Sequence, residues 1–265
     1  MEQSRLVTKI RESAEPALIR QNEQMRQELD MAAEFQRAVL PSAIDLQYLD
    51  IAIVYRPYSD VSGDVYDFLL NREGELAIFL GDATGHGIAA ALMTMMIHIG
   101  LDGIRRNLAT DESIRILNKV IACRQTGRSV SGVFFRITQS GYLTVTHAGH
   151  PSLIIIPANG ETLVQFDEGG CALGIFEDEP VPYEEESYQL AVGDKVIAYT
   201  DAAIEWSNPD KEIFGLHRLL DTLTQHRNES IASISTALTG ELEKFSRGLG
   251  CKDDLTVLTL EFTGD

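Results

Sequence analysis

The chain has 265 residues, enough for one large domain or two small ones, and its hydrophobic content of 44% is ordinary for a globular protein. Its 40 acidic residues outnumber the 22 basic ones and give a net charge of −18. This charge argues against nonspecific nucleic-acid binding and against anionic membrane surfaces, because both need a positively charged face.

Three cysteines, Cys123, Cys171 and Cys251, are far apart in the sequence and lack the spacing of a zinc site or a disulfide framework. This usage favours a reducing compartment. No uninterrupted apolar run is long enough to span a bilayer, and the first residues lack the layout of a signal peptide. The sequence therefore predicts a cytoplasmic protein without a membrane partner, unless the chain is a piece of a longer receptor.

Residues 1–40 predict a helical segment that ends at Pro41, because they contain no glycine and are rich in Glu, Gln and Arg. We expect Pro16 to divide this segment or to start a second helix. Beyond it, apolar or small residues recur every seven positions, at Leu18, Met25, Ala32 and Val39. The pattern fits a coiled-coil-like linker that could form a homodimer, or an amphipathic helix that lies on its own domain.

A second domain is expected over residues 41–265, where short apolar runs alternate with turn residues. The predicted strands lie at residues 51–55, 76–80, 132–137, 142–146, 152–156, 195–199 and 255–262. One predicted helix begins directly after Gly87. Three more are predicted over about 112–122, 215–226 and 230–246. Strand runs interrupted by paired helices predict a layered α+β sandwich rather than a wound parallel sheet.

Aspartates stand where predicted strands meet turns, at Asp64, Asp82 and Asp201 and in the pair Asp253-Asp254. A carboxylate at a strand end is held at the rim of the core, and several that converge repel one another unless a cation neutralises them. Mg²⁺ and Mn²⁺ prefer such hard oxygen ligands. The pattern therefore predicts metal-assisted hydrolysis.

The most specific stretch runs from Gly81 to Gly87 and reads Gly-Asp-Ala-Thr-Gly-His-Gly, where the glycines allow a sharp turn between a strand and a helix. It resembles the signature of bacterial metal-dependent serine/threonine phosphatases of the type 2C-like superfamily, in the sporulation and stress-response branch. Further blocks resemble this branch in the right order over about 33–262. They are residues 61–68, Asn118, residues 148–151, 173–174, 199–201, 208–210, 214–215 and 253–256.

The resemblance implies a four-layer αββα sandwich, with two central antiparallel sheets and a centre for two Mn²⁺ or Mg²⁺ ions at one edge of the sheets. Asp82 would bridge both ions, and Asp201 and Asp253 would complete the first site. Asp64 and the backbone carbonyl of Ala83 would serve the second site. A water activated by both ions would attack phosphorus, which makes Asp64 and Asp82 the predicted catalytic residues.

Some neighbouring polar residues have competing interpretations. Of the adjacent pair, Asp253 is the predicted ligand and Asp254 a structural cap. Asp67 is expected to form hydrogen bonds within the site or to stabilise a turn. His86 is expected to cap or pack, with proton donation to the leaving oxygen as the alternative. His147 and His150 are predicted to have structural roles, and Asp194 and Asp210 to lie in surface turns. The acidic run at residues 184–186 is predicted to be a solvated edge.

The resemblance implies a phosphatase acting on phosphoserine or phosphothreonine of a protein, usually in this branch a phosphorylated anti-sigma-factor antagonist in a partner-switching pathway. The N-terminal helix would link the domain to an upstream sensor or regulator. The alternative is a low-turnover pseudo-phosphatase that acts as a binding module, which Ala202-Ala203 favours because the branch usually has Gly-Val there. A receiver domain fits less well, since such domains are about half this length and alternate strand with helix.

Overall fold

The computed structural model describes residues 2–41, 44–85, 87–104, 108–124, 127–166, 169–177 and 182–264, and in the first range the side chains of Pro16 and of residues 18–41. The chain divides into two compact units, Met1–Val39 and Leu40–Asp265. None of the helices in these ranges combines the length and the apolar character that a bilayer crossing needs.

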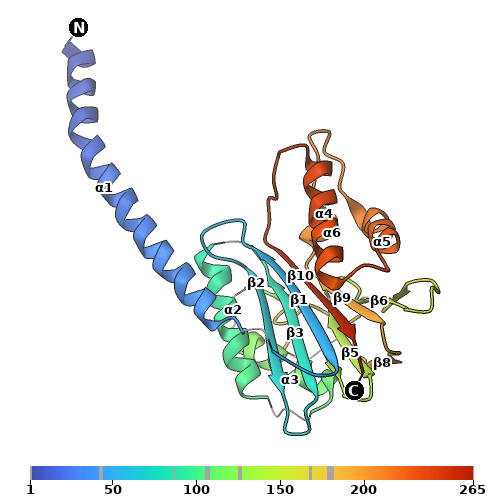
Figure 1. Ribbon diagram of the computed structural model, residues 1–265. Coiled ribbons are helices and arrows are strands. Elements are labelled where there is room, and N and C mark those ends of the chain that lie inside the picture. The colour runs from blue at the N-terminus through green and yellow to red at the C-terminus, as the bar shows by residue number, and fades with distance from the viewer. Residues whose placement is uncertain are drawn as a thin grey trace. The chain divides into compact units, whose positions relative to one another are not determined.

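The first unit is one helix, α1 (Glu2–Val39), drawn in blue in Figure 1. It continues through Pro16, so the expected division at this residue is wrong. A proline inside a helix removes one hydrogen bond and costs about 3 kcal/mol. In a helix of 38 residues, the hydrogen bonds on both sides of Pro16 can offset that loss. Leu18 and Met25, two positions of the predicted seam, are each 58% exposed.

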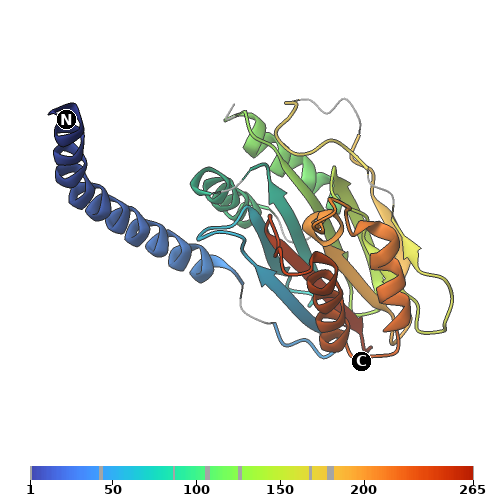
Figure 2. The same ribbon diagram turned by 90° about the horizontal axis from the view of Figure 1, so that it is seen from above.

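The second unit consists of two antiparallel sheets that pack face to face, with helices on both outer sides (Figures 1 and 2). The first sheet, here the β10 sheet, has the strand order β1-β10-β9-β6-β7, and the second, the β3 sheet, has the order β2-β3-β4-β5-β8. The strands are β1 (Leu49–Arg56), β2 (Asp64–Leu70), β3 (Leu76–Ala83), β4 (Val130–Ile137), β5 (Tyr142–Ala148), β6 (Ile154–Ile156), β7 (Val164–Gln165), β8 (Glu186–Gln189), β9 (Lys195–Tyr199) and β10 (Leu255–Phe262).

Helices α2 (Ile88–Asp102) and α3 (Thr110–Ala122), green in Figure 1, cover the β3 sheet. Helices α4 (Ala202–Glu205), α5 (Gly215–Gln225) and α6 (Ile231–Ser246) cover the β10 sheet. These layers confirm the predicted αββα sandwich. Three apolar clusters hold them together: one between the sheets and one under each helical layer.

Strand β2 shows how the layers position a polar residue. Its side chains alternate, so Val65 and Leu69 pack under the helices α2 and α3 while Tyr66 and Phe68 pack between the sheets. Asp64 shares the face of Tyr66 and Phe68, and it therefore points toward the β10 sheet. This strand was not expected from the sequence, nor were β7, β8 and α4.

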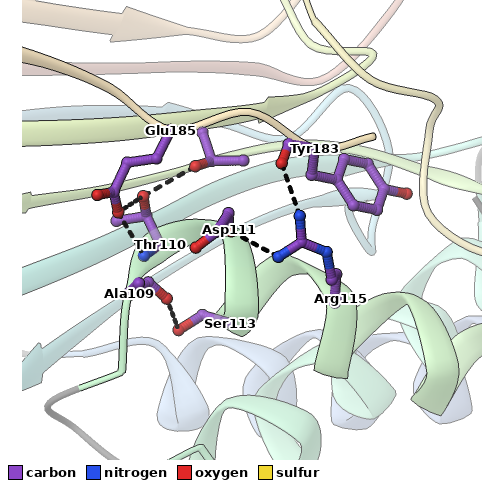
Figure 3. Close-up of polar contacts among 8 residues, drawn as sticks. Ala109, Thr110, Asp111, Ser113, Arg115, Tyr183 and Glu185 are labelled. Atoms are coloured by element: carbon purple, nitrogen blue, oxygen red, sulfur yellow. Dashed lines mark hydrogen bonds and ion pairs between the residues drawn. The ribbon is translucent and has the colours of Figure 1, made fainter. Parts of the chain in front are cut away.

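The acidic run at residues 184–186 is more than a solvated edge. Oε2 of Glu185 accepts hydrogen bonds from the backbone N–H of Thr110 at 2.8 Å and from its hydroxyl at 2.6 Å (Figure 3). Thr110 begins α3, whose N-cap residue Ala109 has no side-chain acceptor, so Glu185 caps this helix from a distant segment. Arg115 donates to the carbonyl of Tyr183 at 2.9 Å in the same segment. The two contacts hold α3 against the chain that leads into β8.

We expect Glu185→Ala to lower the free energy of unfolding by about 1 kcal/mol, the usual cost of losing a helix cap. Urea unfolding followed by circular dichroism measures the change. Glu184→Ala is the matched control, because Glu184 is an exposed neighbour with the same charge, and it should change stability by less than about 0.5 kcal/mol. An equal decrease in the free energy of unfolding in both variants would show that the effect comes from the lost negative charge and not from the hydrogen bonds that cap α3.

Candidate functional site

The four aspartates predicted as ligands come from both sheets and meet at one edge of the sandwich. Asp64 begins β2 and Asp82 lies near the end of β3, and the two are direct partners in the β2–β3 register. Asp201 follows β9, and Asp253 precedes β10. The charges of Asp201 and Asp253 both act on Asp82, so the two sheet edges contribute to one acidic cluster.

Asp64 is the most deeply buried member of the cluster, with 1% of its surface exposed. Its Oδ2 accepts hydrogen bonds from the hydroxyls of Thr200, at 3.0 Å, and Thr256, at 2.6 Å. Its Oδ1 is buried and has no hydrogen-bond partner among the described residues. A buried carboxylate oxygen without a partner is costly, and a cation would remove that cost.

The two threonines are functional residues that the sequence reasoning missed. Thr200 follows β9 and Thr256 lies in β10, whereas Asp64 belongs to the other sheet. Their hydroxyls therefore tie the sheets together at the site and fix which oxygen of Asp64 stays open. Both stand inside motifs already recognised, at residues 199–201 and 253–256, and that position was the available signal.

An oxygen-lined cradle lies beside Gly63. A methyl group on this glycine would lie 3.0 Å from the carbonyl oxygen of Ala83, 3.2 Å from that of Gly85 and 3.3 Å from Oδ1 of Asp82. Three oxygens thus gather on the side of Gly63 where a side chain would otherwise project. Carboxylate and carbonyl oxygens are the ligands that Mg²⁺ and Mn²⁺ prefer. The carbonyl of Ala83, predicted as a ligand, is part of this cradle.

The electrostatics of the cluster oppose ionisation. Burial, and then the charge of Asp82, raise the pKa of Asp64 well above its ordinary value. Burial, followed by the charges of Asp201 and Asp253, raises the pKa of Asp82 to about 8. Burial and the nearby Glu205 raise the pKa of Asp201 to about 6. Without a cation, Asp64 and Asp82 therefore favour the protonated form at neutral pH.

These residues fit a hard divalent cation, although no three acidic, histidine or cysteine side chains within the described ranges are gathered tightly enough to hold one by themselves. The charge interactions at Asp82 and the cradle at Gly63 show that the donors are neighbours. The acidic side chains are not gathered more tightly because like charges repel one another when no cation neutralises them. In addition, some of the donor oxygens belong to the backbone rather than to side chains. Mg²⁺ needs few protein ligands because it keeps several waters.

The adjacent Asp253 and Asp254 have different surroundings. Asp254 is 3% exposed, and its two carboxylate oxygens accept the backbone N–H groups of Tyr58 at 2.7 Å and Gly63 at 2.6 Å. Both oxygens thus hold the loop before β2, and they place Gly63 next to the cradle. Asp253 is exposed, and its Oδ1 accepts the backbone N–H of Asp254 at 2.9 Å. This difference favours Asp253 as the ligand.

Asp67 lies neither in the cluster nor in a turn. It is on the helix-facing side of β2, and its Oδ2 is 3.0 Å from Nδ1 of His98 in α2. The pair joins the strand to the helix that follows the Gly81–Gly87 loop. His86, considered as a proton donor or a cap, lies outside the described residues.

The two histidines near residue 150 are buried in the fold. Nε2 of His147 accepts the backbone N–H of Leu153 at 3.2 Å, and Nδ1 of His150 is 3.1 Å from the hydroxyl of Ser131. Burial, and then the neighbouring His147, lower the pKa of His150 to about 3. His150 is therefore neutral at physiological pH.

The two aspartates predicted in surface turns differ from each other. Asp210 is exposed and pairs with Arg247 at 2.9 Å. Asp194 also lies in a turn, but the expectation that it is on the surface is wrong, because it is 3% exposed. It accepts the backbone N–H groups of Ala158 at 2.8 Å and Ala191 at 2.9 Å, which explains why a carboxylate can be buried there.

A cavity of about 150 Å³ opens beside the cluster and is lined by Asp201, Ala202, Glu205, Trp206, Ser207, Cys251, Lys252 and Asp253. Ala202 begins the short helix α4, and neither Ala202 nor Ala203 has a positive φ. An alanine fits this helical conformation without strain. The replacement of the usual glycine therefore does not by itself distort Asp201.

We expect Asp82→Asn to stabilise the metal-free protein at neutral and alkaline pH. Because the pKa of Asp82 is raised in the folded state, its contribution to stability is lost as the pH rises from about 4 through about 8. Urea unfolding in chelator measures the free energy of unfolding at pH 6 and at pH 9. This free energy should fall less between the two pH values in the variant than in the wild type, by on the order of 1–3 kcal/mol. Added Mg²⁺ should stabilise the wild type far more than the variant. An identical pH dependence in both proteins would contradict the electrostatic coupling.

Comparison with known proteins places this geometry in a family. A family model described as stage II sporulation protein E (SpoIIE) matches residues 72–263. Protein IcfG of Synechocystis sp. is 26% identical over 269 residues, which cover 89% of this chain and 41% of that protein. Phosphoserine phosphatase RsbU of Bacillus subtilis is 25% identical over 187 residues, with 69% and 55% covered. The chain thus spans about half the length of these curated relatives.

Solved structures share the fold. The SiaA-PP2C domain of Pseudomonas aeruginosa superimposes with a TM-score of 0.80 at 21% identity, covering 91% of this chain and 98% of that one. RsbX in complex with magnesium superimposes with a TM-score of 0.62 at 17% identity, covering 83% and 98%. With the family match extending over most of the sandwich, from before β3 to the end of β10, the chain belongs to the stage II sporulation protein E (SpoIIE) family.

Proposed function

We propose that the protein is a metal-dependent phosphatase that hydrolyses phosphoserine or phosphothreonine in a protein substrate. The observation that carries this proposal is the pairing of Asp64 with Asp82, where a buried oxygen of Asp64 has no partner and the preceding residue, Gly63, faces three further oxygens. Family membership supports the reaction, since the relative RsbU is named a phosphoserine phosphatase. The magnesium in the RsbX structure supports the choice of a divalent cation.

In this proposal Asp82, Asp64, the carbonyl of Ala83, Asp201 and Asp253 would hold two Mg²⁺ or Mn²⁺ ions. Bound ions of this kind make water a better nucleophile at neutral pH and neutralise charge on the phosphoryl group. The reaction adds one water to phosphorus and breaks the bond to the serine or threonine oxygen, which leaves as a hydroxyl. The products are the unmodified side chain and inorganic phosphate.

The rest of the chain keeps the ligands in place. The hydroxyls of Thr200 and Thr256 engage one oxygen of Asp64 and leave the other open. Asp254 holds the backbone of Gly63, and thereby the open side of the cradle. Such contacts set the orientation of metal ligands, and their loss typically lowers metal affinity or activity by about 10–100-fold.

The alternative, a pseudo-phosphatase that acts as a binding module, depended on the Ala202-Ala203 replacement. The helical backbone at these residues accommodates alanine, so the replacement does not argue against turnover. All four aspartates are present and share one cluster, which favours an active enzyme.

The test is hydrolysis of a phosphoserine peptide and of p-nitrophenyl phosphate, with added Mn²⁺ and with chelator. We expect turnover that depends on the metal, and a loss of at least about 100-fold in Asp82→Asn and Asp201→Asn, since both variants remove proposed ligands. Asp210→Asn is the matched control, because Asp210 is an exposed aspartate paired with Arg247. Metal binding without turnover in the wild type would favour the pseudo-phosphatase instead.

We extend the proposal to the physiological setting. The substrate would be a phosphorylated anti-sigma-factor antagonist in a partner-switching pathway in the cytoplasm, as the resemblance to the stress-response branch implies. The domain boundary would fall near residue 40, with α1 as a regulatory linker to an upstream sensor. Supporting this role, Leu18 and Met25 lie one heptad apart and are both well exposed, as a pairing seam requires.

Deleting residues 1–30 tests the linker. We expect the deletion to change the molar mass in solution from dimer to monomer and to alter the basal phosphatase rate. A finer comparison replaces Leu18 and Met25 with Asp, with Ile19→Asp as the control, because Ile19 is 51% exposed but lies off the seam. Light scattering and initial rates measure both effects. An unchanged mass and rate after the deletion would exclude pairing and regulation through this helix.

A further inference from the structure

Arg128 contacts the loop that carries Asp82, from the segment just before β4. Its Nη1 donates to the carbonyl oxygen of Thr84 at 2.7 Å. The same atom would lie 2.9 Å from a methyl group placed on Gly85. Thr84 lies between Ala83 and Gly85, whose carbonyls are two of the three cradle oxygens, so the guanidinium group contacts the residue next to the proposed ligand Ala83.

Hydrogen bonds other than that of Arg128 also hold the loop. The backbone N–H of Thr84 donates to the carbonyl of Ser129 at 2.9 Å, and the backbone N–H of Ser129 donates to the hydroxyl of Thr84 at 3.1 Å. The hydroxyl of Thr84 also donates to the carbonyl of Ser129 at 3.1 Å. Three hydrogen bonds thus join the loop to the start of β4 in addition to the one from the guanidinium group.

The negative charge of the site suggests that an arginine at this position contributes to substrate binding. A phosphoserine carries between one and two negative charges at pH 7. It has to approach a cluster that includes Asp64, Asp82, Asp201, Asp253 and Glu205, in a chain of net charge −18. A positive group beside the cradle offsets that repulsion. Arginine suits the task because its planar fork of N–H donors matches two phosphoryl oxygens at once.

We propose that Arg128 binds the phosphoryl oxygens of the substrate and positions the phosphorus over the cradle. This inference rests on the proposed phosphatase function. Arg128 is a substrate-binding residue in this scheme, and the contact with Thr84 pre-orders its side chain for that purpose. The ligand class is a phosphoryl dianion, either a phosphomonoester as substrate or inorganic phosphate as the reaction product.

The experiment compares the wild type with Arg128→Ala and Arg128→Lys in the full chain. Arg124→Ala is the matched control, because Arg124 is an exposed arginine four residues earlier, so its loss removes the same charge nearby. Three quantities are measured: KM for a phosphoserine peptide, inhibition by inorganic phosphate, and Mg²⁺ affinity by calorimetry. A fourth is the binding of inorganic phosphate to the Mg²⁺-loaded protein, which does not require turnover.

In Arg128→Ala we expect KM and the inhibition constant of phosphate to rise together by roughly 10–100-fold, the range for a lost charge-assisted hydrogen bond. Arg128→Lys should fall between the wild type and the alanine variant, since it keeps the charge but loses the fork. Mg²⁺ affinity should change less than about twofold, the resolution of the calorimetric comparison, and Arg124→Ala should resemble the wild type.

Two results would overturn the inference. The first is unchanged phosphate affinity in Arg128→Ala. The second is a parallel loss of Mg²⁺ and phosphate affinity, which would show that Arg128 only braces the loop. An inactive wild type would refute the proposed function separately, while phosphate calorimetry on the same proteins would still decide the role of Arg128.

Discussion

The site depends on one unfavourable arrangement, a cluster of carboxylates around Asp64, whose own charge water cannot screen. Asp64 is almost completely buried and lies opposite Asp82 in the β2–β3 pair. Burial and mutual repulsion both favour protonation, so the apo fold keeps the cluster at a cost in stability. Packing of the sandwich and the hydroxyls of Thr200 and Thr256 offset that cost. A ligand-binding centre that destabilises its own fold is a common compromise between stability and function.

Neither sheet contains a site by itself. The β3 sheet supplies Asp64 and Asp82, and the edge of the β10 sheet supplies Asp201, Asp253 and the two threonines. The strand registers fix which side chains meet. A slip of one residue in β2 would turn Asp64 toward the helical layer, where Val65 and Leu69 now pack. The dense apolar packing between the sheets thus determines the chemistry at their edge, although no apolar side chain takes part in it.

The sequence predicted the elements whose pattern is local. Residues 195–199 and 255–262 form β9 and β10 with the expected bounds, because aliphatic, β-branched and aromatic residues dominate both segments. Strand β2 was missed since Asp64 and Asp67 read as turn residues, and their partners Thr256 and His98 lie 192 and 31 positions away. Glu185 and Asp194 were misjudged for the same reason: a carboxylate that accepts backbone N–H groups looks like a surface charge in the sequence. The aspartates themselves were identified through motif order, which carries information that local propensity lacks.

The contact between Asp254 and Gly63 spans 191 positions in the chain, and that between Thr256 and Asp64 spans 192. Such contacts form late in folding, because closing a long loop costs entropy before any contact repays it. During synthesis, Asp64 is made early and waits without its hydroxyl partners until residue 256 has left the ribosome. The β3 sheet could assemble before then, but with an incomplete acidic edge. Activity would therefore appear only in molecules that have completed the sandwich, and a prematurely terminated chain would have no working centre.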